Sequence, residues 1–223
     1  MIRDNITAVQ QAIAVCLEKN ARTKKSLTLL AVSKKFPAET IRQAYEAGLR
    51  HFGENYLQEA IDKIKKLADL KIEWHYIGAI QSNKVKQIAE YFDWVQTVDR
   101  LKVARLLDDE RTNHPLNVCI QVNIDNEPTK AGVKAEEVGV LAEQIRQLSN
   151  LRLRGLMAIP RASDDVEIQQ QSFAKMHALF NELNRKGFEL DTLSMGMSRD
   201  YALAIKYGAT IIRIGTAIFG RRE

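Results

Sequence analysis

The chain has 223 residues, of which 45% are hydrophobic and 27% charged, and its net charge is +5. The length suits one large domain over residues 1–223, and no apolar run approaches the roughly 18 residues that cross a membrane, which excludes a membrane protein. Basic residues are mixed with acidic ones instead of gathering with aromatic side chains, which argues against a nucleic-acid partner. The two cysteines, Cys16 and Cys119, form no disulfide or metal spacing, and the amino terminus shows no leader pattern, so we expect a cytoplasmic protein.

Helical and strand-like patterns alternate along the whole chain. Residues 2–17 carry apolar side chains at steps of three and four, which predicts an amphipathic helix. Eight strand-like runs follow, at 26–34, 50–53, 72–78, 94–98, 116–124, 151–159, 192–196 and 210–215. Seven further helical patterns lie between them, at 38–47, 55–68, 82–92, 100–112, 134–148, 164–186 and 200–207.

This alternation predicts the fold class. Several of the strands are apolar on both faces, as in a parallel sheet that helices cover. Eight such units in a chain of this length indicate an α/β fold of the TIM type, a (β/α)8 barrel without a second domain. The helix at 2–17 is extra to the repeat and fills the position that would follow the eighth strand. An open doubly wound sheet is the competing fold, but no strand is followed by a GxGxxG turn.

Two lysines end the first predicted strand, in the stretch SLTLLAVSKKFP. Because side chains alternate along a strand, only one of Lys34 and Lys35 can point into the barrel. One interpretation is that both are solvated charges at a strand end. The other is that one is a nucleophilic amine, since active sites of this fold lie at the carboxyl ends of the strands.

The last two predicted strands lead into turns that favour an anion. SMGMSRD and RIGTAIFG supply small residues, hydroxyls and backbone amides where barrels commonly bind phosphate. Ser198 or Asp200 could cap the helix at 200–207, and capping alone would explain the first turn. Capping does not explain the second turn, Gly215-Thr216. An amine, a phosphate cradle and Arg213 between them have the layout of a pyridoxal phosphate (PLP) site. The strand ends hold no paired carboxylates and no His/Cys cluster, so we expect no bound metal.

Four more residues lie at predicted strand ends, and two of them have alternative interpretations. His75, in EWHYIG, is either a core histidine or part of the site. Asn55, in FGENY, is either a helix cap or part of the site. We interpret Asn123 and Met157 as structural.

Taken together, these motifs resemble those of the pyridoxal phosphate homeostasis family, barrel proteins similar to the N-terminal domain of alanine racemase. The matching stretches, from about residue 29 to residue 220, are AVSK, FGENYLQE, WHYIGAIQSNK, DWVQTVDR, LRLRGLMAIP, SMGMSRD and IRIGTAIFG. The resemblance implies that Lys34 carries PLP as a Schiff base and that Arg213 lies beside the pyridine nitrogen. It also implies phosphate contacts from Ser198, Gly215 and Thr216, with Asn55 and His75 lining the ring. Lys130, in EPTKAG, matches a family lysine and either assists cofactor entry and exit or is a solvated loop charge.

The resemblance implies a binding protein instead of an enzyme, one that buffers or delivers PLP within vitamin B6 homeostasis. Its recipients would be PLP-dependent apo-enzymes. An arginine beside the ring nitrogen disfavours the pyridinium ion and weakens the cofactor as an electron sink. Racemases of this type add a tyrosine from a C-terminal β domain, whereas this chain stops at Glu223, so we expect a monomer without that second acid–base group. Two alternatives stay open, namely a weak PLP-dependent racemase and an aldolase-like barrel whose lysine attacks a substrate carbonyl directly.

Overall fold

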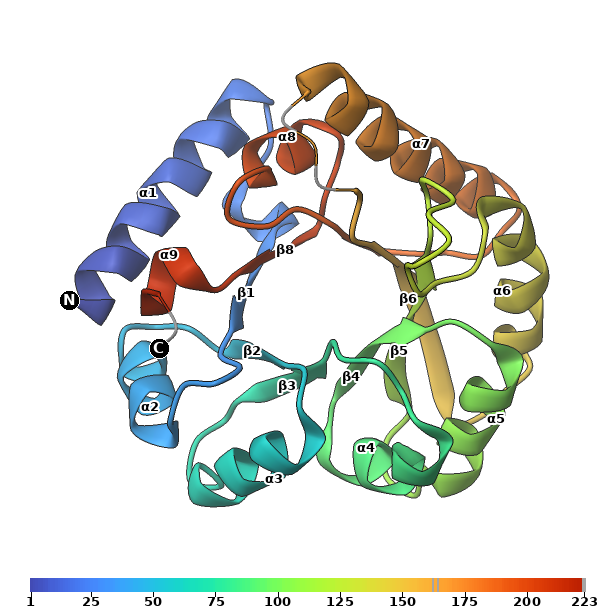
Figure 1. Ribbon diagram of the computed structural model, residues 1–223, viewed down its shortest axis with the longest axis horizontal. Helices are drawn as coiled ribbons and strands as arrows, with labels where there is room; N and C mark the ends of the chain where they lie inside the picture. The colour runs from blue at the N-terminus through green and yellow to red at the C-terminus, as the bar shows by residue number, and fades with distance from the viewer. Residues whose placement is uncertain (162, 164, 222–223) are drawn as a thin grey trace.

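Eight parallel strands close into a barrel in the computed structural model, which describes every residue except 162, 164, 222 and 223. Each strand pairs with its sequence neighbours, and β1 closes the ring against β8, with Leu30 opposite Arg213. The predicted α/β barrel is therefore confirmed (Figure 1). The strands are β1 (Thr28–Val32), β2 (His51–Glu54), β3 (Glu73–Tyr76), β4 (Trp94–Val98), β5 (Leu116–Val122), β6 (Leu151–Ala158), β7 (Thr192–Ser194) and β8 (Ile211–Ile214).

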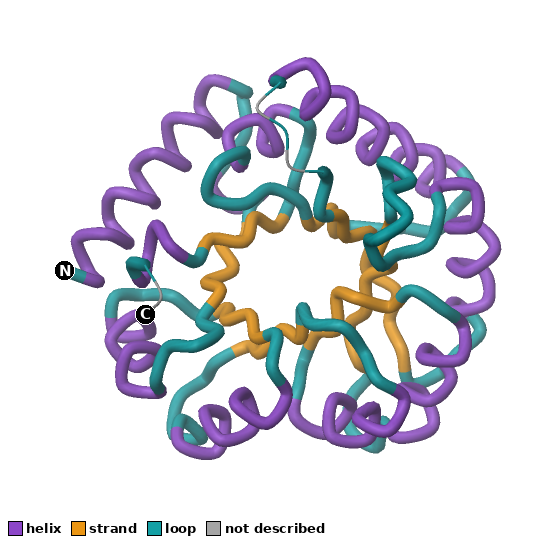
Figure 2. Tube along the Cα trace, viewed as in Figure 1, coloured by secondary structure: helices purple, strands orange, loops and turns teal. Residues whose placement is uncertain are grey.

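Helices surround the barrel as an outer ring, which Figure 2 shows in purple around the orange strands. They are α1 (Ile2–Lys19), α2 (Ala38–Glu46), α3 (Leu57–Lys66), α4 (Val85–Tyr91), α5 (Leu101–Glu110), α6 (Val138–Arg146), α7 (Val166–Arg185), α8 (Tyr201–Lys206) and α9 (Thr216–Phe219). Within the described residues none of them is long and apolar enough to span a membrane.

The amino-terminal helix closes the ring where the sequence predicted it. α1 packs against α8, α9 and α2, beside β8 (Figure 1). The sequence patterns missed α9 after the last strand, because four residues are too few to show a helical period. The predicted start of α7 at 164 lies outside the described residues. α7 begins at Val166, where the Asp165 carboxylate accepts hydrogen bonds from the backbone amides of Glu167 and Ile168, two of the donors that a helix leaves open at its start.

Strand alternation separates an apolar outer layer from a polar barrel interior. On β5, Val118 and Ile120 face the helices and belong to the main core, whereas Cys119 between them packs with Trp94 and Met157 in a separate small cluster. Many inward positions around the barrel carry polar side chains, among them Thr28, His51, His75, Gln96, Asn117, Thr192, Ser194 and Arg213. Because buried polar groups need partners, the interior is organised by hydrogen bonds.

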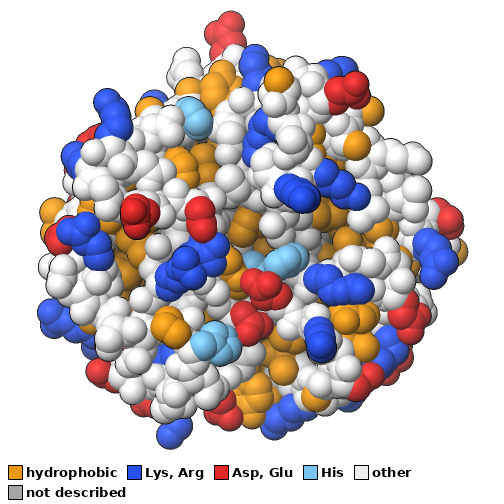
Figure 3. All heavy atoms as spheres, turned by 180° about the vertical axis from the view of Figure 1, so that it is seen from behind, with side chains coloured by type: hydrophobic (Ala, Val, Ile, Leu, Met, Phe, Trp, Pro, Cys, Tyr) orange, Lys and Arg blue, Asp and Glu red, His pale blue; other side chains and the backbone are white. Residues whose placement is uncertain are grey.

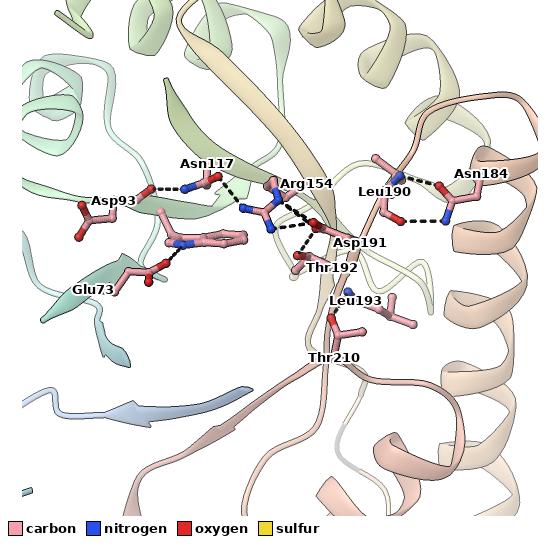
Figure 4. A network of polar contacts seen from close by, with 11 residues as sticks. Glu73, Asp93, Asn117, Arg154, Asn184, Leu190, Asp191, Thr192, Leu193 and Thr210 are labelled. Atoms are coloured by element: carbon pink, nitrogen blue, oxygen red, sulfur yellow. Dashed lines mark hydrogen bonds and ion pairs between the residues drawn. The ribbon is translucent and has the colours of Figure 1, made fainter. Parts of the chain in front are cut away.

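Paired charges link the strands at the amino-terminal mouth, the end of the barrel where the strands begin. The Arg154 guanidinium contacts Asp191 at 2.7 Å and donates to the Asn117 side-chain oxygen at 2.8 Å (Figure 4). Its guanidinium carbon also lies 4.7 Å from the centre of the Trp94 ring, and the Trp94 indole donates to Glu73. Each charge in this group has a partner on a neighbouring strand, so the network joins β3 to β7.

Candidate functional site

The turn after β1 carries the two lysines at the carboxyl-terminal mouth, the end of the barrel where the strands stop. β1 ends at Val32, so the strand alternation predicted through Lys35 stops earlier than expected. Lys34 is half-buried in the turn, and Lys35 is exposed with a backbone φ of 67°. A left-handed backbone at a residue other than glycine costs on the order of 1 kcal/mol and needs support from its surroundings.

That support comes from a buried cluster between β1, β2 and α3. The Lys63 ammonium lies 2.8 Å from Glu54, 2.5 Å from Glu59 and 2.9 Å from the Ser33 carbonyl oxygen. The Ser33 hydroxyl donates to Glu54 at 2.6 Å, and the backbone amide of Lys35 donates to Glu59 at 2.6 Å. The cluster therefore holds the residues on both sides of Lys34.

The cluster places one ammonium between two carboxylates, one of which is buried. Glu54 is fully buried and Lys63 is 5% exposed. Burial raises the pKa of Glu54, while the Lys63 ammonium and the Ser33 hydroxyl oppose that shift. Sequence reasoning missed Lys63, although a signal exists: it lies among Ala60, Ile64 and Leu67 on the apolar face of α3. A lysine at such a position needs a carboxylate partner.

Arg213, on β8, is a buried cation of a different kind. It is 4% exposed, and its guanidinium donates to the Ser194 hydroxyl and to the Ala158 carbonyl oxygen, each at 2.8 Å. No carboxylate among the described residues lies within ion-pair distance of it. Burial lowers the pKa of Arg213 to about 10, which leaves it charged at neutral pH. Its charge is thus held by neutral oxygen atoms, an arrangement suited to an anionic or electron-rich ligand.

The two predicted anion-binding turns do lie side by side. The Thr216 hydroxyl is 3.5 Å from the Ser198 hydroxyl, although the two residues are 18 positions apart in the sequence. Gly196, with φ of 93°, leads into the first turn, and a Cβ there would collide with Ala204 of α8. Asp200 is the N-cap of α8 and accepts a hydrogen bond from the Met197 amide, which leaves Ser198 to face the second turn. The arrangement gathers two hydroxyls at the mouth, with Gly215 next to Thr216.

Asn55 follows β2 directly and does not cap α3, whose N-cap is Tyr56. Its side-chain oxygen is buried and has no hydrogen-bond partner. Gly78 lies against it so closely that a Cβ would collide with the Asn55 carbonyl oxygen. A buried amide oxygen without a partner costs free energy, and a ligand donor placed there would recover it. The interpretation of Asn55 as the helix cap is therefore wrong, and its role in a site stays a prediction.

His75 fits its interpretation as a core histidine, and its contact with a cofactor ring stays a prediction. It is fully buried inside the barrel, and its Nε2 atom is 3.2 Å from Nδ1 of His51, the first residue of β2. Its ring stacks on Trp94 with centroids 5.2 Å apart. It also lines a pocket at the amino-terminal mouth, together with His51 and Trp94.

The loop after β5 accounts for Asn123 and Lys130. The Asn123 side chain donates to the Glu127 and Lys130 carbonyl oxygens and accepts from the Glu127 amide, which fits its structural interpretation. The Lys130 ammonium lies 2.6 Å from Glu127 and donates to the Ile159 carbonyl oxygen at 3.3 Å. These contacts connect the loop to the end of β6. They do not decide whether Lys130 assists cofactor entry and exit or is a solvated loop charge.

Comparisons with known proteins agree with the fold over the whole chain. A family model described as the N-terminal domain of alanine racemase matches residues 10–223. Relatives named pyridoxal phosphate homeostasis protein are 51% identical in Pseudomonas aeruginosa and 49% identical in Pasteurella multocida. Each match covers 100% of this chain, with 96% and 98% of the relative respectively.

Solved structures give the same result. PipY of Synechococcus elongatus, solved both with and without PLP bound, is 37% identical with a TM-score of 0.87, over 99% of this chain and 100% of PipY. Alanine racemase of Clostridium difficile has a TM-score of 0.80 at 14% identity, over 98% of this chain and 57% of the racemase. At that identity the likeness shows the fold alone.

Proposed function

Because this chain belongs to the pyridoxal phosphate homeostasis family, whose barrel is that of the alanine racemase N-terminal domain, we propose that it binds PLP at its carboxyl-terminal mouth. The observation that carries the proposal is Arg213, a buried guanidinium that donates to neutral oxygen atoms and has no carboxylate within ion-pair distance among the described residues. A pyridine nitrogen is an electron-rich acceptor that such a donor recognises.

Other residues at this mouth fit the remaining groups of PLP. The hydroxyls of Ser198 and Thr216, with the backbone at Gly215, suit the phosphate, which accepts several hydrogen bonds. The orphaned Asn55 oxygen supplies an acceptor beside the ring. Lys34 would supply the amine that holds the cofactor reversibly through its aldehyde. Reversibility is the property that a protein releasing its cofactor requires.

The proposed role is to hold PLP and to deliver it to PLP-dependent apo-enzymes in the cytoplasm, as a monomer and without catalysis of its own. Two observations support it: relatives that match nearly end to end are named as homeostasis proteins, and PipY was solved with PLP bound. Arg213 also supports it, because a cation beside the ring nitrogen disfavours the protonated pyridine on which strong carbanion chemistry depends.

The test is to load the purified protein with PLP and to follow the visible absorbance of the Schiff base. We expect a yellow protein whose borohydride-reduced adduct maps to Lys34. We expect Lys34→Ala to lose both the absorbance and the adduct, while Lys35→Ala, one residue along on an exposed side chain, keeps both. A wild-type protein that stays colourless after loading would overturn the proposal.

A second measurement separates a carrier from an enzyme. The loaded protein is incubated with each enantiomer of alanine and other amino acids, and the opposite enantiomer is measured. We expect no sustained turnover. Turnover that is lost on Lys34→Ala would replace the carrier role with that of a racemase.

A further inference from the structure

A continuous chain of hydrogen bonds crosses the barrel interior from Arg213 to the opposite mouth. The Ser194 hydroxyl accepts from Arg213 at 2.8 Å and lies 2.6 Å from the Gln96 side-chain oxygen. The Gln96 side-chain nitrogen lies 3.0 Å from Nδ1 of His75, whose Nε2 is 3.2 Å from Nδ1 of His51. The five residues lie on β8, β7, β4, β3 and β2. The hydrogen bond from Ser194 to Gln96 crosses the barrel interior, because β7 and β4 are not neighbouring strands.

The direction of every bond in this chain follows from its first donor. Arginine only donates, so Ser194 accepts from Arg213 and uses its single proton toward the Gln96 oxygen. The Gln96 amide nitrogen then donates to Nδ1 of His75. A neutral imidazole that accepts at Nδ1 carries its proton on Nε2, so His75 donates to His51.

Burial fixes this order. Ser194, Gln96 and His75 are all fully buried, so a donor or acceptor left without a partner there would destabilise the protein. Burial, together with the positive charge that His51 can carry, lowers the pKa of His75 well below its usual value, which keeps the ring neutral. A neutral His75 ring has one N–H donor and one acceptor nitrogen. All the hydrogen bonds from Arg213 to His51 therefore point in the same direction.

The far end of the chain lies in a pocket of about 350 Å³ at the amino-terminal mouth, which is lined by His51, His75 and Trp94 among others. Figure 3 looks at this face and shows histidine and acidic side chains gathered around its centre. The groups that face His75 here are His51 and, behind it, Glu73, whose carboxylate is 3.6 Å from His51 Nδ1. Glu73 itself accepts from the Trp94 indole.

The same three residues, His51, Glu73 and His75, have the spacing of a metal site, with donor atoms within 4.8 Å of one another. Sequence spacing did not reveal this cluster. A metal ligand must offer a lone pair. The bond direction derived from Arg213 places the proton of His75 on Nε2, the atom that would have to bind the metal, so the cluster is better explained as the end of the chain.

We propose that Ser194, Gln96 and His75 are positioning residues, which orient the Arg213 guanidinium through a one-way hydrogen-bond relay that His51 terminates. The relay matters for PLP only if the proposed function holds, because Arg213 is the residue that addresses the ring nitrogen. Its own prediction, the proton position on His75, does not depend on PLP.

The first test therefore uses the protein without added cofactor. Nitrogen-15 spectra of the histidine rings identify which ring nitrogen carries the proton. We expect neutral His75 with the proton on Nε2 at neutral pH, and no change when Zn²⁺ is added. A proton on Nδ1, a charged ring, or a Zn²⁺-dependent shift of the His75 resonances would each overturn the relay, whatever the protein does with PLP.

The second test measures PLP retention in two variants of β7. Ser194→Ala removes the acceptor of Arg213, and we expect roughly tenfold faster release of PLP with a displaced absorbance band. Thr192→Val is the matched control: it lies two residues earlier on the same face, and its hydroxyl donates to Asp191 outside the relay. Equal retention in the two variants, or equal loss, would contradict a specific role for Ser194.

The third test exchanges the terminal acceptor. His51→Gln keeps an oxygen that can accept from His75, whereas His51→Leu leaves the buried His75 proton without a partner. We expect His51→Gln to retain PLP as the wild type does and His51→Leu to release it about threefold faster. Identical release from both variants would show that the chain ends before His51. A wild-type protein that binds no PLP at all would instead reject the proposed function and leave the tautomer prediction standing.

Discussion

Lys63 and Arg213 are both buried cations near the carboxyl-terminal mouth, and they are neutralised in opposite ways. Lys63, outside the barrel wall, lies within 2.8 Å of Glu54 and within 2.5 Å of Glu59. Arg213, inside the barrel, contacts one hydroxyl and one backbone carbonyl. Enclosing a cation with carboxylates completes its environment, whereas neutral oxygen atoms leave a net charge that attracts a ligand. We infer that the first arrangement stabilises the fold and that the second is suited to binding a ligand.

We expect the largest effect from removing Lys63, the cation that carboxylates neutralise. Lys63→Met leaves Glu54 as a buried carboxylate without its cation, and we expect the free energy of unfolding to fall by about 3–5 kcal/mol. Because Lys63 also binds the Ser33 carbonyl oxygen, the turn that carries Lys34 should loosen as well. Chemical denaturation of the variant and the wild type at pH 7 measures the difference.

The pH dependence of that loss checks its cause. Burial already raises the pKa of Glu54 above 4.5, and removing Lys63 raises it further. A carboxyl group that ionises at higher pH in the folded state destabilises the fold as pH rises through the raised pKa. The deficit of Lys63→Met should therefore shrink as pH falls toward 4.5. The double variant Lys63→Met/Glu54→Gln should lack this pH dependence, and a deficit equal at all pH values would contradict the mechanism.

We expect the second largest effect from removing Arg213, the cation that contacts only neutral oxygen atoms. Arg213→Met removes a cation that no carboxylate balances among the described residues, so we expect a smaller loss of stability than in Lys63→Met. PLP retention should instead fall by roughly 10- to 100-fold, the loss of a charged hydrogen bond to the ligand. Equilibrium binding of PLP together with thermal unfolding separates the two quantities. If Arg213→Met unfolds as readily as Lys63→Met but binds PLP normally, Arg213 stabilises the fold and does not bind the ligand.

The sequence predicted the fold well because that prediction depends on repetition. Eight strand–helix alternations and apolar strands are signals that many residues share, so single errors, such as the missed α9, leave the topology unchanged. The contact between Ser198 and Thr216 was also predictable, since adjacent strands of a barrel bring their following turns together.

The sequence could not predict contacts that depend on one rotation or one register. His75 lies near the end of β3 and pairs in register with Gly53, yet its ring reaches His51, two residues earlier on β2. Gln96 and Ser194 lie 98 residues apart, and although each falls inside a motif, no local pattern indicates that the two side chains meet. Only closure of the barrel brings them into hydrogen-bond contact.

The third effect lies at the two hydroxyl turns. Thr216→Val and Ser198→Ala each remove one hydroxyl from the predicted phosphate cradle, and we expect each to weaken PLP binding by about 1–2 kcal/mol. The affinity for pyridoxal, which lacks the phosphate, should not change. Ser172→Ala, a buried hydroxyl on α7 bound to Asp125, is the control that should leave PLP affinity unaltered. A similar loss for pyridoxal and PLP would place these hydroxyls away from the phosphate.

The smallest expected effect on stability belongs to Asn55, and it distinguishes a site residue from a structural one. Its buried side-chain oxygen has no partner, so Asn55→Ala removes no hydrogen bond to that oxygen. We therefore expect the free energy of unfolding without PLP to change by less than about 0.5 kcal/mol. With PLP bound, the wild type should gain more stability than the variant, because only the wild type offers the ligand this acceptor. A large loss of stability without PLP would show that Asn55 serves the fold, as Lys63 does, and would remove it from the site.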